Sequence, residues 1–339
     1  MSTPDRDIEA VLRESGPDYE KLSYRRPTAG HQGEVFLVTL THKGDEYEVV
    51  IKFQAGDPQF ALEPFLHEYV ADRTDVPVPR ILVFKQEPEL DVEPYFVTER
   101  VEGSNLAEAM QAEEFDGETF ADVIEHAGEI LGAMHSEIGF EGFGRLALED
   151  ERLIVDEFSW DWQAFFRGIT ENHIDALAET PFEDLQETAR SRLEASIDVV
   201  DSDGIPRLIH DDFRPANMLY DPSGERPISA VLDWQFALAG DPEYHVARTE
   251  FLFIDPNYGT EEIRENLRQR LYEGYRKYRD FDPDEHYQKR RTVYQFATLL
   301  WRMSNFDAAF AEYSDLQRTR AKHAYRKQFD RAVADLPTD

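Results

Sequence analysis

The sequence predicts an α+β protein with a strand-rich first part and a longer, mainly helical second part. Val, Ile, Phe and Thr dominate much of the stretch between residues 24 and 53, which also contains a Lys-Gly-Asp turn, as in antiparallel strands. From Leu106 onward, apolar residues mostly recur at helical spacing. At 339 residues the chain is long enough for two lobes with a substantial core.

The first part is expected to begin with a helix and to continue as strands around a second helix. Gly16 is a natural stop for the first helix. Pro64 suits the first turn of the second, where its missing N–H is no loss. In order, we expect a helix over residues 4–14, strands over 34–40 and 47–53, a helix opening at 61, and strands over 81–84 and 95–101.

The second part is expected to consist mainly of packed helices. Residues 142–144, Gly-Phe-Gly, are predicted to form a loop, and an aromatic-rich helix is predicted to start at Phe158. Residues 260–335 are predicted to be helices that turn their aromatic residues inward, Trp301 included. His135 has no partner motif in the sequence, and we expect it to be structural.

The composition is extremely acidic, with 70 Asp and Glu against 36 Lys and Arg and a net charge of −34. Aromatic residues make up 12% of the chain, which argues against a disordered acidic segment. We interpret the charge as the surface of a folded protein adapted to high salt, where a Debye length of about 3 Å at 1 M screens self-repulsion. Since no basic stripe could neutralise phosphates, nucleic acid is not an expected partner.

Cysteine is absent, which excludes disulfides, a thiol nucleophile and cysteine-based metal sites. The first residues, Met-Ser-Thr-Pro-Asp-Arg-Asp, are polar, so no signal peptide is expected. No run approaches 18 apolar residues, and no membrane partner is expected. The sequence thus predicts a soluble cytoplasmic protein, and it leaves the oligomeric state open.

The stretch from Leu208 to Trp234 carries the chemistry. Three short apolar runs, at residues 208–209, 218–220 and 228–232, are predicted strands, and Asp-Pro-Ser-Gly forms a turn between the last two. The strands and turns present four polar side chains at fixed points: His210, Asp212, Asn217 and Asp233. Phosphoryl transfer from Mg-ATP needs such a set, because one carboxylate accepts the proton of the attacking hydroxyl while an amide oxygen and a second carboxylate hold metal ions.

The segment His-Asp-Asp-Phe-Arg-Pro-Ala-Asn, residues 210–217, followed by Leu-Asp-Trp at 232–234, resembles the aminoglycoside phosphotransferase family of small-molecule kinases. The family usually has H-G-D-x-x-P-x-N and then I-D-W-E, so Asp211 stands where Gly is usual and Gln235 where Glu is usual. The spacing selects Asp212 as the matching aspartate. The acidic composition resembles that of haloarchaeal members.

The resemblance implies a bilobal protein-kinase-like fold, with an antiparallel sheet and helix in the first lobe and a larger, mainly helical second lobe. It also implies ATP and Mg²⁺ as cofactors and a hydroxyl of a small molecule as acceptor. Asp212 would deprotonate the acceptor, while Asn217 and Asp233 would bind Mg²⁺. Arg214 would neutralise charge on the transferred group, or equally would pair with a nearby carboxylate.

Lys52 is the informative residue of the first lobe. A lysine within Val-Val-Ile-Lys-Phe is costly to bury unpaired, so it is expected to point into a cleft. It resembles the family's phosphate-binding strand lysine, although an edge-strand lysine that opposes aggregation is the alternative. Its expected partner is a helix glutamate, for which Glu63 fits the family and Glu68 is also open.

Other nucleotide contacts are implied by the resemblance. Gly30, Gln32 and Gly33 lie where the family has its phosphate-covering loop. The hinge would lie at about residues 97–103, where backbone groups near Glu99 and Val101 would read the adenine. The two lobes would then be a nucleotide-binding lobe of residues 1–101 and a catalytic and substrate lobe of residues 102–339.

Other classes fit less well. After Asp233 no Ala-Pro-Glu appears before Asn266, as a protein kinase would need, and no Walker motif is present. An inactive, ATP-binding regulator of kinase fold is the non-enzyme alternative. The acceptor itself is not specified: Trp160 and Trp162 either border its pocket or pack between helices. The sequence leaves aminoglycosides, sugars and amino alcohols all open.

Overall fold

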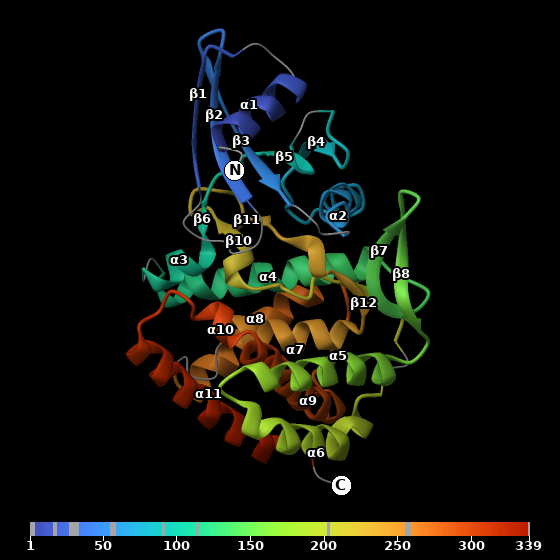
Figure 1. Cartoon of the computed structure of the whole chain (residues 1–339). Helices are drawn as coiled ribbons and strands as arrows, with labels where there is room; N and C mark the ends of the chain where they lie inside the picture. The colour runs from blue at the N-terminus through green and yellow to red at the C-terminus, as the bar shows by residue number, and fades with distance from the viewer. Residues whose placement is uncertain are drawn as a thin grey trace.

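The structure is a computed structural model that describes residues 4–15, 19–26, 34–54, 59–89, 92–112, 115–201, 204–254 and 259–337. Figure 1 shows a strand-rich part and a larger helical part, and this confirms the predicted α+β fold class. The first part is a five-stranded antiparallel sheet of order β1-β2-β3-β5-β4. Its elements are α1 (Pro4–Ser15), β1 (Lys21–Arg25), β2 (Glu34–His42), β3 (Asp45–Phe53), α2 (Leu62–Ala71), β4 (Ile81–Lys85) and β5 (Tyr95–Glu99).

The predicted hairpin at residues 34–53 is confirmed. His42 pairs with Asp45, so the loop holds only Lys43 and Gly44. Their φ angles are 52° and 85°, the positive values that a two-residue turn needs to match the twist of the strands. Alternate residues of the hairpin, Phe36 and Ile51 among them, are buried in a core that α1 covers.

The second part is mainly helical, with two small sheets of order β11-β10-β6 and β8-β7-β12-β9. Its helices are α3 (Leu106–Gln111), α4 (Gly117–Glu137), α5 (Trp162–Ala176), α6 (Gln186–Ser196), α7 (Pro242–Phe253), α8 (Glu261–Arg276), α9 (Glu285–Ser304), α10 (Phe306–Ala309) and α11 (Asp315–Asp335). Its strands are β6 (Ser104–Asn105), β7 (Phe143–Glu149), β8 (Arg152–Ser159), β9 (Arg207–Ile209), β10 (Met218–Tyr220), β11 (Ile228–Val231) and β12 (Leu238–Gly240), and short 3₁₀ turns include η4 (Pro215–Asn217) and η5 (Trp234–Phe236).

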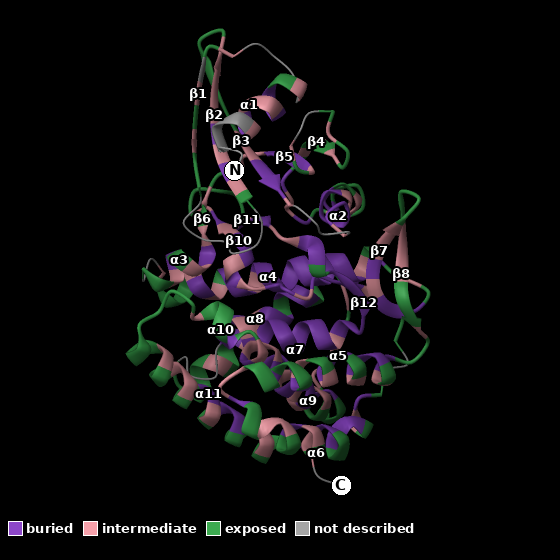
Figure 2. Cartoon of the chain, in the orientation of Figure 1, coloured by how far each residue is buried: buried purple, intermediate pink, exposed green. Residues whose placement is uncertain are grey.

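Buried residues concentrate where α4, α7, α8 and β12 meet, below the sheet (Figure 2). Helices α4 and α8 approach closely because glycines face the partner backbone. A Cβ on Gly128 would lie 2.1 Å from the carbonyl oxygen of Leu271, and one on Gly274 would lie 1.9 Å from that of Glu125. Any side chain at either position would force the helices apart.

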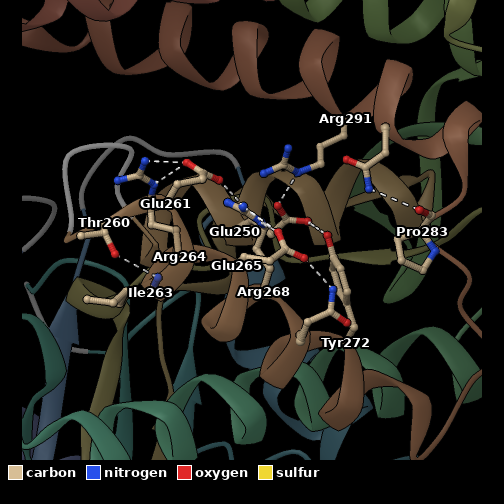
Figure 3. A network of polar contacts seen from close by, with 12 residues as sticks. Glu250, Thr260, Glu261, Ile263, Arg264, Glu265, Arg268, Tyr272, Pro283 and Arg291 are labelled. Carbon is tan, nitrogen blue, oxygen red and sulfur yellow. Dashed lines mark hydrogen bonds and ion pairs between the residues drawn. The ribbon is translucent and has the colours of Figure 1, made fainter.

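A buried carboxylate joins α7 to α8 and α9. Glu250 accepts a hydrogen bond from the Tyr272 hydroxyl over 2.5 Å and pairs with Arg291 (Figure 3). It also accepts a hydrogen bond from the Tyr287 hydroxyl over 2.7 Å. Because every contact donates to the carboxylate, the charge is buried without being left unpaired. No helix in the described parts of the chain is long and apolar enough to span a membrane.

The expectation for residues 142–159 is wrong. Phe143 begins β7, and Phe158 lies within β8, which ends at Ser159, instead of starting a helix. The aromatic-rich helix α5 begins at Trp162, with Asp161 as its N-cap. The hairpin turns at two acidic residues, Asp150 and Glu151, with φ of 48° and 60°. Acidic residues occur throughout this chain, so their presence in a turn gives no signal comparable to Asn-Gly.

Candidate active site

Residues 210–217, called the motif loop below, connect β9 to β10 and are anchored by His210. This ring is fully buried, and its Nε2–H donates to the carbonyl of Leu232 over 2.9 Å. The amide of Leu232 in turn donates to the carbonyl of Asn217 over 2.9 Å. Burial lowers the pKa of His210, which keeps the ring neutral near pH 7. Leu232 directly precedes Asp233, so Asp233 is held beside both ends of the motif loop.

Asp212 is buried, and both of its carboxylate oxygens are engaged. The side-chain amide of Asn217 donates to Oδ2 over 2.7 Å and to the backbone oxygen of Asp212 over 3.0 Å. Arg214 Nε donates to Oδ1 over 2.7 Å. The pairing that the sequence left open for Arg214 is therefore present, and its partner is the proposed base itself.

Lys52 projects from β3 into a polar cluster, and only 7% of the residue is exposed. Its Nζ lies 2.6 Å from Glu63 Oε2 and 3.0 Å from Asp233 Oδ1. Burial lowers the pKa of Lys52, but Glu63 and Asp233 outweigh burial and the net pKa lies above its ordinary value. Glu68 is exposed, so Glu63 is the glutamate that pairs with Lys52.

Two aspartates of this region have left-handed backbones. Asp211 has φ 57° and Asp233 has φ 68°. Positive φ is uncommon for residues other than glycine, and such residues persist where their surroundings hold them. Asp211 therefore adopts the conformation that the family's usual glycine would take without strain.

The sequence analysis missed two residues that hold this region, Tyr244 and Arg248 of α7. The Tyr244 hydroxyl donates to Asp211 Oδ1 over 2.8 Å, and Arg248 Nε donates to the Asp211 carbonyl over 2.7 Å. The guanidinium carbon of Arg248 lies 4.3 Å from the ring centroid of Trp301. Trp301 was expected to point fully inward, but it is only half-buried. The unusual aspartate at 211 was the available signal, since a carboxylate where the family usually has glycine needs hydrogen-bond donors when it is half-buried.

The nucleotide contacts expected in the first lobe are described only in part. Gly30, Gln32 and Gly33 lie outside the described residues. The amide of Glu99 donates to the carbonyl of Arg80 over 3.1 Å and is not available to a nucleotide. The backbone groups that remain as predicted adenine contacts at the hinge are the carbonyl of Glu99 and the backbone of Val101.

The two tryptophans considered for the acceptor pocket have different environments. Trp162 is 1% exposed, donates from Nε1 to the Tyr294 hydroxyl over 3.0 Å, and packs on Phe143 and Phe166. Trp160 is 77% exposed at the end of β8. These contacts favour core packing for Trp162, while Trp160 is free to contact a ligand.

His135 and His245 form a buried pair. His135 Nε2 lies 3.0 Å from His245 Nδ1, and His135 Nδ1 lies 2.9 Å from the Tyr275 hydroxyl. Burial lowers the pKa of both rings, so both are neutral. These contacts favour the structural role expected for His135. Asp241 caps α7, because its side chain accepts a hydrogen bond from the Glu243 amide over 2.6 Å.

A strand lysine paired with a helix glutamate, beside a loop that carries an aspartate bonded to an asparagine, is the arrangement of a kinase-like phosphotransferase. Residues 23–286 match the family model for the phosphotransferase enzyme family, APH, and the chain belongs to this family. The predicted family and class of enzyme are thereby confirmed. A comparison of the sequence with curated proteins gives no match.

Solved structures show the same fold. A Thermobifida fusca protein provisionally named a fructosamine-3-kinase matches with a TM-score of 0.62 and 17% identity, over 98% of this chain and 99% of that one. A spectinomycin phosphotransferase solved with ADP and spectinomycin matches with a TM-score of 0.54 and 14% identity, over 97% and 95%. A microcompartment-associated aminopropanol kinase matches with a TM-score of 0.52 and 17% identity, over 97% and 93%. These similarities confirm the expected fold.

Proposed function

We propose that this phosphotransferase moves the γ-phosphoryl group of Mg-ATP to a hydroxyl of a small molecule. The observation that carries the proposal is the junction of three distant segments. Lys52 touches Asp233 across 181 residues of sequence, and Leu232, next to Asp233, bonds to His210 and Asn217 of the motif loop. These contacts support the proposal, because in-line phosphoryl transfer requires that the groups proposed to bind phosphate, bind metal and accept the proton share one site.

In this site Asp212 is the base. The acceptor oxygen bonds to the γ-phosphorus as the bond from phosphorus to the bridging oxygen breaks and ADP leaves. The proton of the acceptor hydroxyl passes to a carboxylate oxygen of Asp212. Since Arg214 holds Oδ1 and Asn217 holds Oδ2, the acceptor has to share or displace one of these contacts, and Arg214, the more exposed of the two, is the one to move. It would then neutralise charge on the transferred group.

The residues present fit Mg²⁺. Asn217 uses its amide nitrogen to bind Asp212, so its amide oxygen would be the metal ligand. Lys52 binds Oδ1 of Asp233, so Oδ2 of Asp233 would be the second ligand. No three His, Asp or Glu side chains of the described residues form a metal cage. Mg²⁺ commonly binds one or two carboxylates together with substrate phosphates, so a sparse oxygen set suits it. When bound, it neutralises charge on the phosphates.

Lys52, oriented by Glu63, would contact the phosphates, while Gly30, Gln32 and Gly33 would cover them. The backbone at Glu99 and Val101 would contact the adenine, at a hinge between lobes of residues 1–101 and 102–339. Three structural neighbours are named for chemically different compounds, which supports a small-molecule acceptor without selecting one. We place the reaction in the cytoplasm, where ATP is supplied, with no nucleic acid or membrane as partner.

Two matched substitutions test the proposal. Asp212→Asn should leave Mg-ATP binding nearly unchanged and lower turnover by about 10²–10⁴-fold, the contribution of a positioned base. Asp233→Asn should weaken both Mg-ATP binding and turnover. Asp221→Asn, in the exposed β10–β11 turn, is the control and should be mild.

Isothermal titration with Mg-ATP and an ATP-consumption assay with a panel of hydroxyl compounds give the two readouts. Equal loss of binding in Asp212→Asn and Asp233→Asn would contradict the separate roles. Tight Mg-ATP binding by the wild type without turnover on any acceptor would favour the ATP-binding regulator.

A further inference from the structure

The conformation of the motif loop depends on a residue that lies one position before the proposed base. Asp211 has φ 57°, a left-handed backbone conformation, and Asp212 directly follows it in the chain. A change in the backbone at 211 would therefore rotate the Asp212 side chain away from its present place. Asp tolerates this region better than most residues, but it does so with a carboxylate that must be matched by donors.

Helix α7 supplies those donors. Arg248 Nε lies 2.7 Å from the Asp211 carbonyl and 3.4 Å from its Oδ1, and Tyr244 donates to Oδ1 over 2.8 Å. Both α7 residues are 2% exposed. Arg248 thus fixes the backbone of residue 211 and balances its charge at once. Burial lowers the pKa of Arg248, but Tyr244 and Asp211 outweigh it and the guanidinium stays charged.

Trp301 of α9 links the contact between Arg248 and Asp211 to the proposed base, Asp212. Its ring lies 4.3 Å from the guanidinium carbon of Arg248 and 6.0 Å from that of Arg214. Arg214 is the residue that holds Asp212 Oδ1. The two successive aspartates are therefore each paired with an arginine, and both arginines lie against one indole ring.

We infer that Arg248 is a positioning residue for phosphoryl transfer, which holds Asp211 left-handed and so sets the place of Asp212. The inference rests on the proposed function and extends it to a residue that touches neither nucleotide nor acceptor. Its effect is on geometry: a misplacement of about 1 Å in a reacting group can cost on the order of 10²-fold in rate. Binding of Mg-ATP, which depends on Lys52 and Asp233, should not depend on Arg248.

The test uses Arg248→Met, which keeps an unbranched apolar stem and removes the charge and the N–H donors of the guanidinium. We expect kcat for ADP release from Mg-ATP, with water as the acceptor, to fall by about 10–100-fold while KM for Mg-ATP changes by less than about threefold. Tyr244→Phe removes one hydroxyl and should fold normally, with a smaller loss of about threefold in kcat. Arg290→Met is the matched control, because Arg290 joins α9 to α7 through Glu243 and not through Asp211. It should lower the melting temperature and leave kcat unchanged.

A double variant separates positioning from general damage to α7. In Asp211→Gly/Arg248→Met both charges are gone and glycine adopts the left-handed backbone without strain. We expect kcat to rise above that of Arg248→Met and to lie within about threefold of the wild type, because removing both members of a buried pair costs less than removing one. Loss of kcat in Arg290→Met equal to that in Arg248→Met, or no recovery in the double variant, would overturn the positioning role. A wild type that binds Mg-ATP but releases no ADP with water or any hydroxyl acceptor would instead refute the phosphoryl transfer itself.

Discussion

Replacing Lys52 by Met should strongly destabilise the protein as well as inactivate it. Lys52 is 7% exposed and lies 2.6 Å from Glu63, whose side chain is also buried. Met keeps most of the apolar volume of the lysine stem, so the main loss is electrostatic. The variant would leave the carboxylate of Glu63 buried without its cation.

The magnitude follows from that burial. Removing one partner of a buried ion pair costs roughly 3–5 kcal/mol, a large part of the roughly 5–15 kcal/mol that stabilises most folded proteins. The side chain of Asp233 is partly exposed to solvent, so the loss of its contact with Lys52 should add little to the destabilisation. Urea-induced unfolding at pH 7, followed by circular dichroism, measures the change in the free energy of unfolding.

Two further variants make the reasoning refutable. Lys289→Met breaks an exposed pair with Glu285 and should change the free energy of unfolding by less than about 1 kcal/mol. Lys52→Met/Glu63→Met removes both buried charges and should be more stable than Lys52→Met alone. A single variant no less stable than the Lys289 control, or a double variant that is the least stable of all, would show that the pair is not the source of stability.

Three other predictions concern the surface, the aromatic residues and pH. The net charge of −34 predicts that the melting temperature rises steeply between 0.1 and 3 M KCl, and a flat profile would remove the interpretation of a halophilic protein. Trp162→Ala should cost roughly 3–5 kcal/mol of stability because the ring is buried. Trp160→Ala should leave the melting temperature unchanged and, if Trp160 borders the acceptor pocket, raise only the KM of the acceptor. Equal effects of the two substitutions on stability would contradict this assignment. Burial lowers the pKa of His67 to about 4, so the unfolded chain binds more protons between pH 6.5 and 4 and stability falls as pH falls through that range. His67 should account for roughly 2–3 kcal/mol of the loss between pH 7 and 4.5, so the stability difference between wild type and His67→Gln should narrow in urea titrations at pH 4.5; a constant difference would refute it.

Local patterns predicted those parts of the fold whose conformation is set by neighbours in sequence. The β2–β3 hairpin was predicted because runs rich in Val, Ile, Phe and Thr flank a Lys-Gly-Asp turn, and the structure forms this turn with positive φ at Lys43 and Gly44. The motif loop was predicted from the spacing of His210, Asp212 and Asn217, which the short strands β9 and β10 hold in place. The β7–β8 hairpin was missed because its turn residues, Asp150 and Glu151, are of the commonest kind in this chain.

The partner of Lys52 could not be decided from the sequence. Glu63 and Glu68 both lie on α2, five positions apart, so their side chains differ in direction by about 140° around the helix. Which of them faces β3 depends on how α2 packs against the sheet. That packing is set by Leu62, Leu66 and Val70, which are buried against residues distant in sequence.

The sequence by itself determined the family and the α+β class, because the spacing of His210, Asp212 and Asn217 within one loop matches the family's pattern. Only the tertiary structure decided that Lys52 meets Asp233 over 181 residues and that Arg248 meets Asp211 over 37. The reason is physical. Sequence pattern records the period of each helix and strand, but contacts between elements depend on the angles at which their buried faces pack, and no local spacing contains those angles.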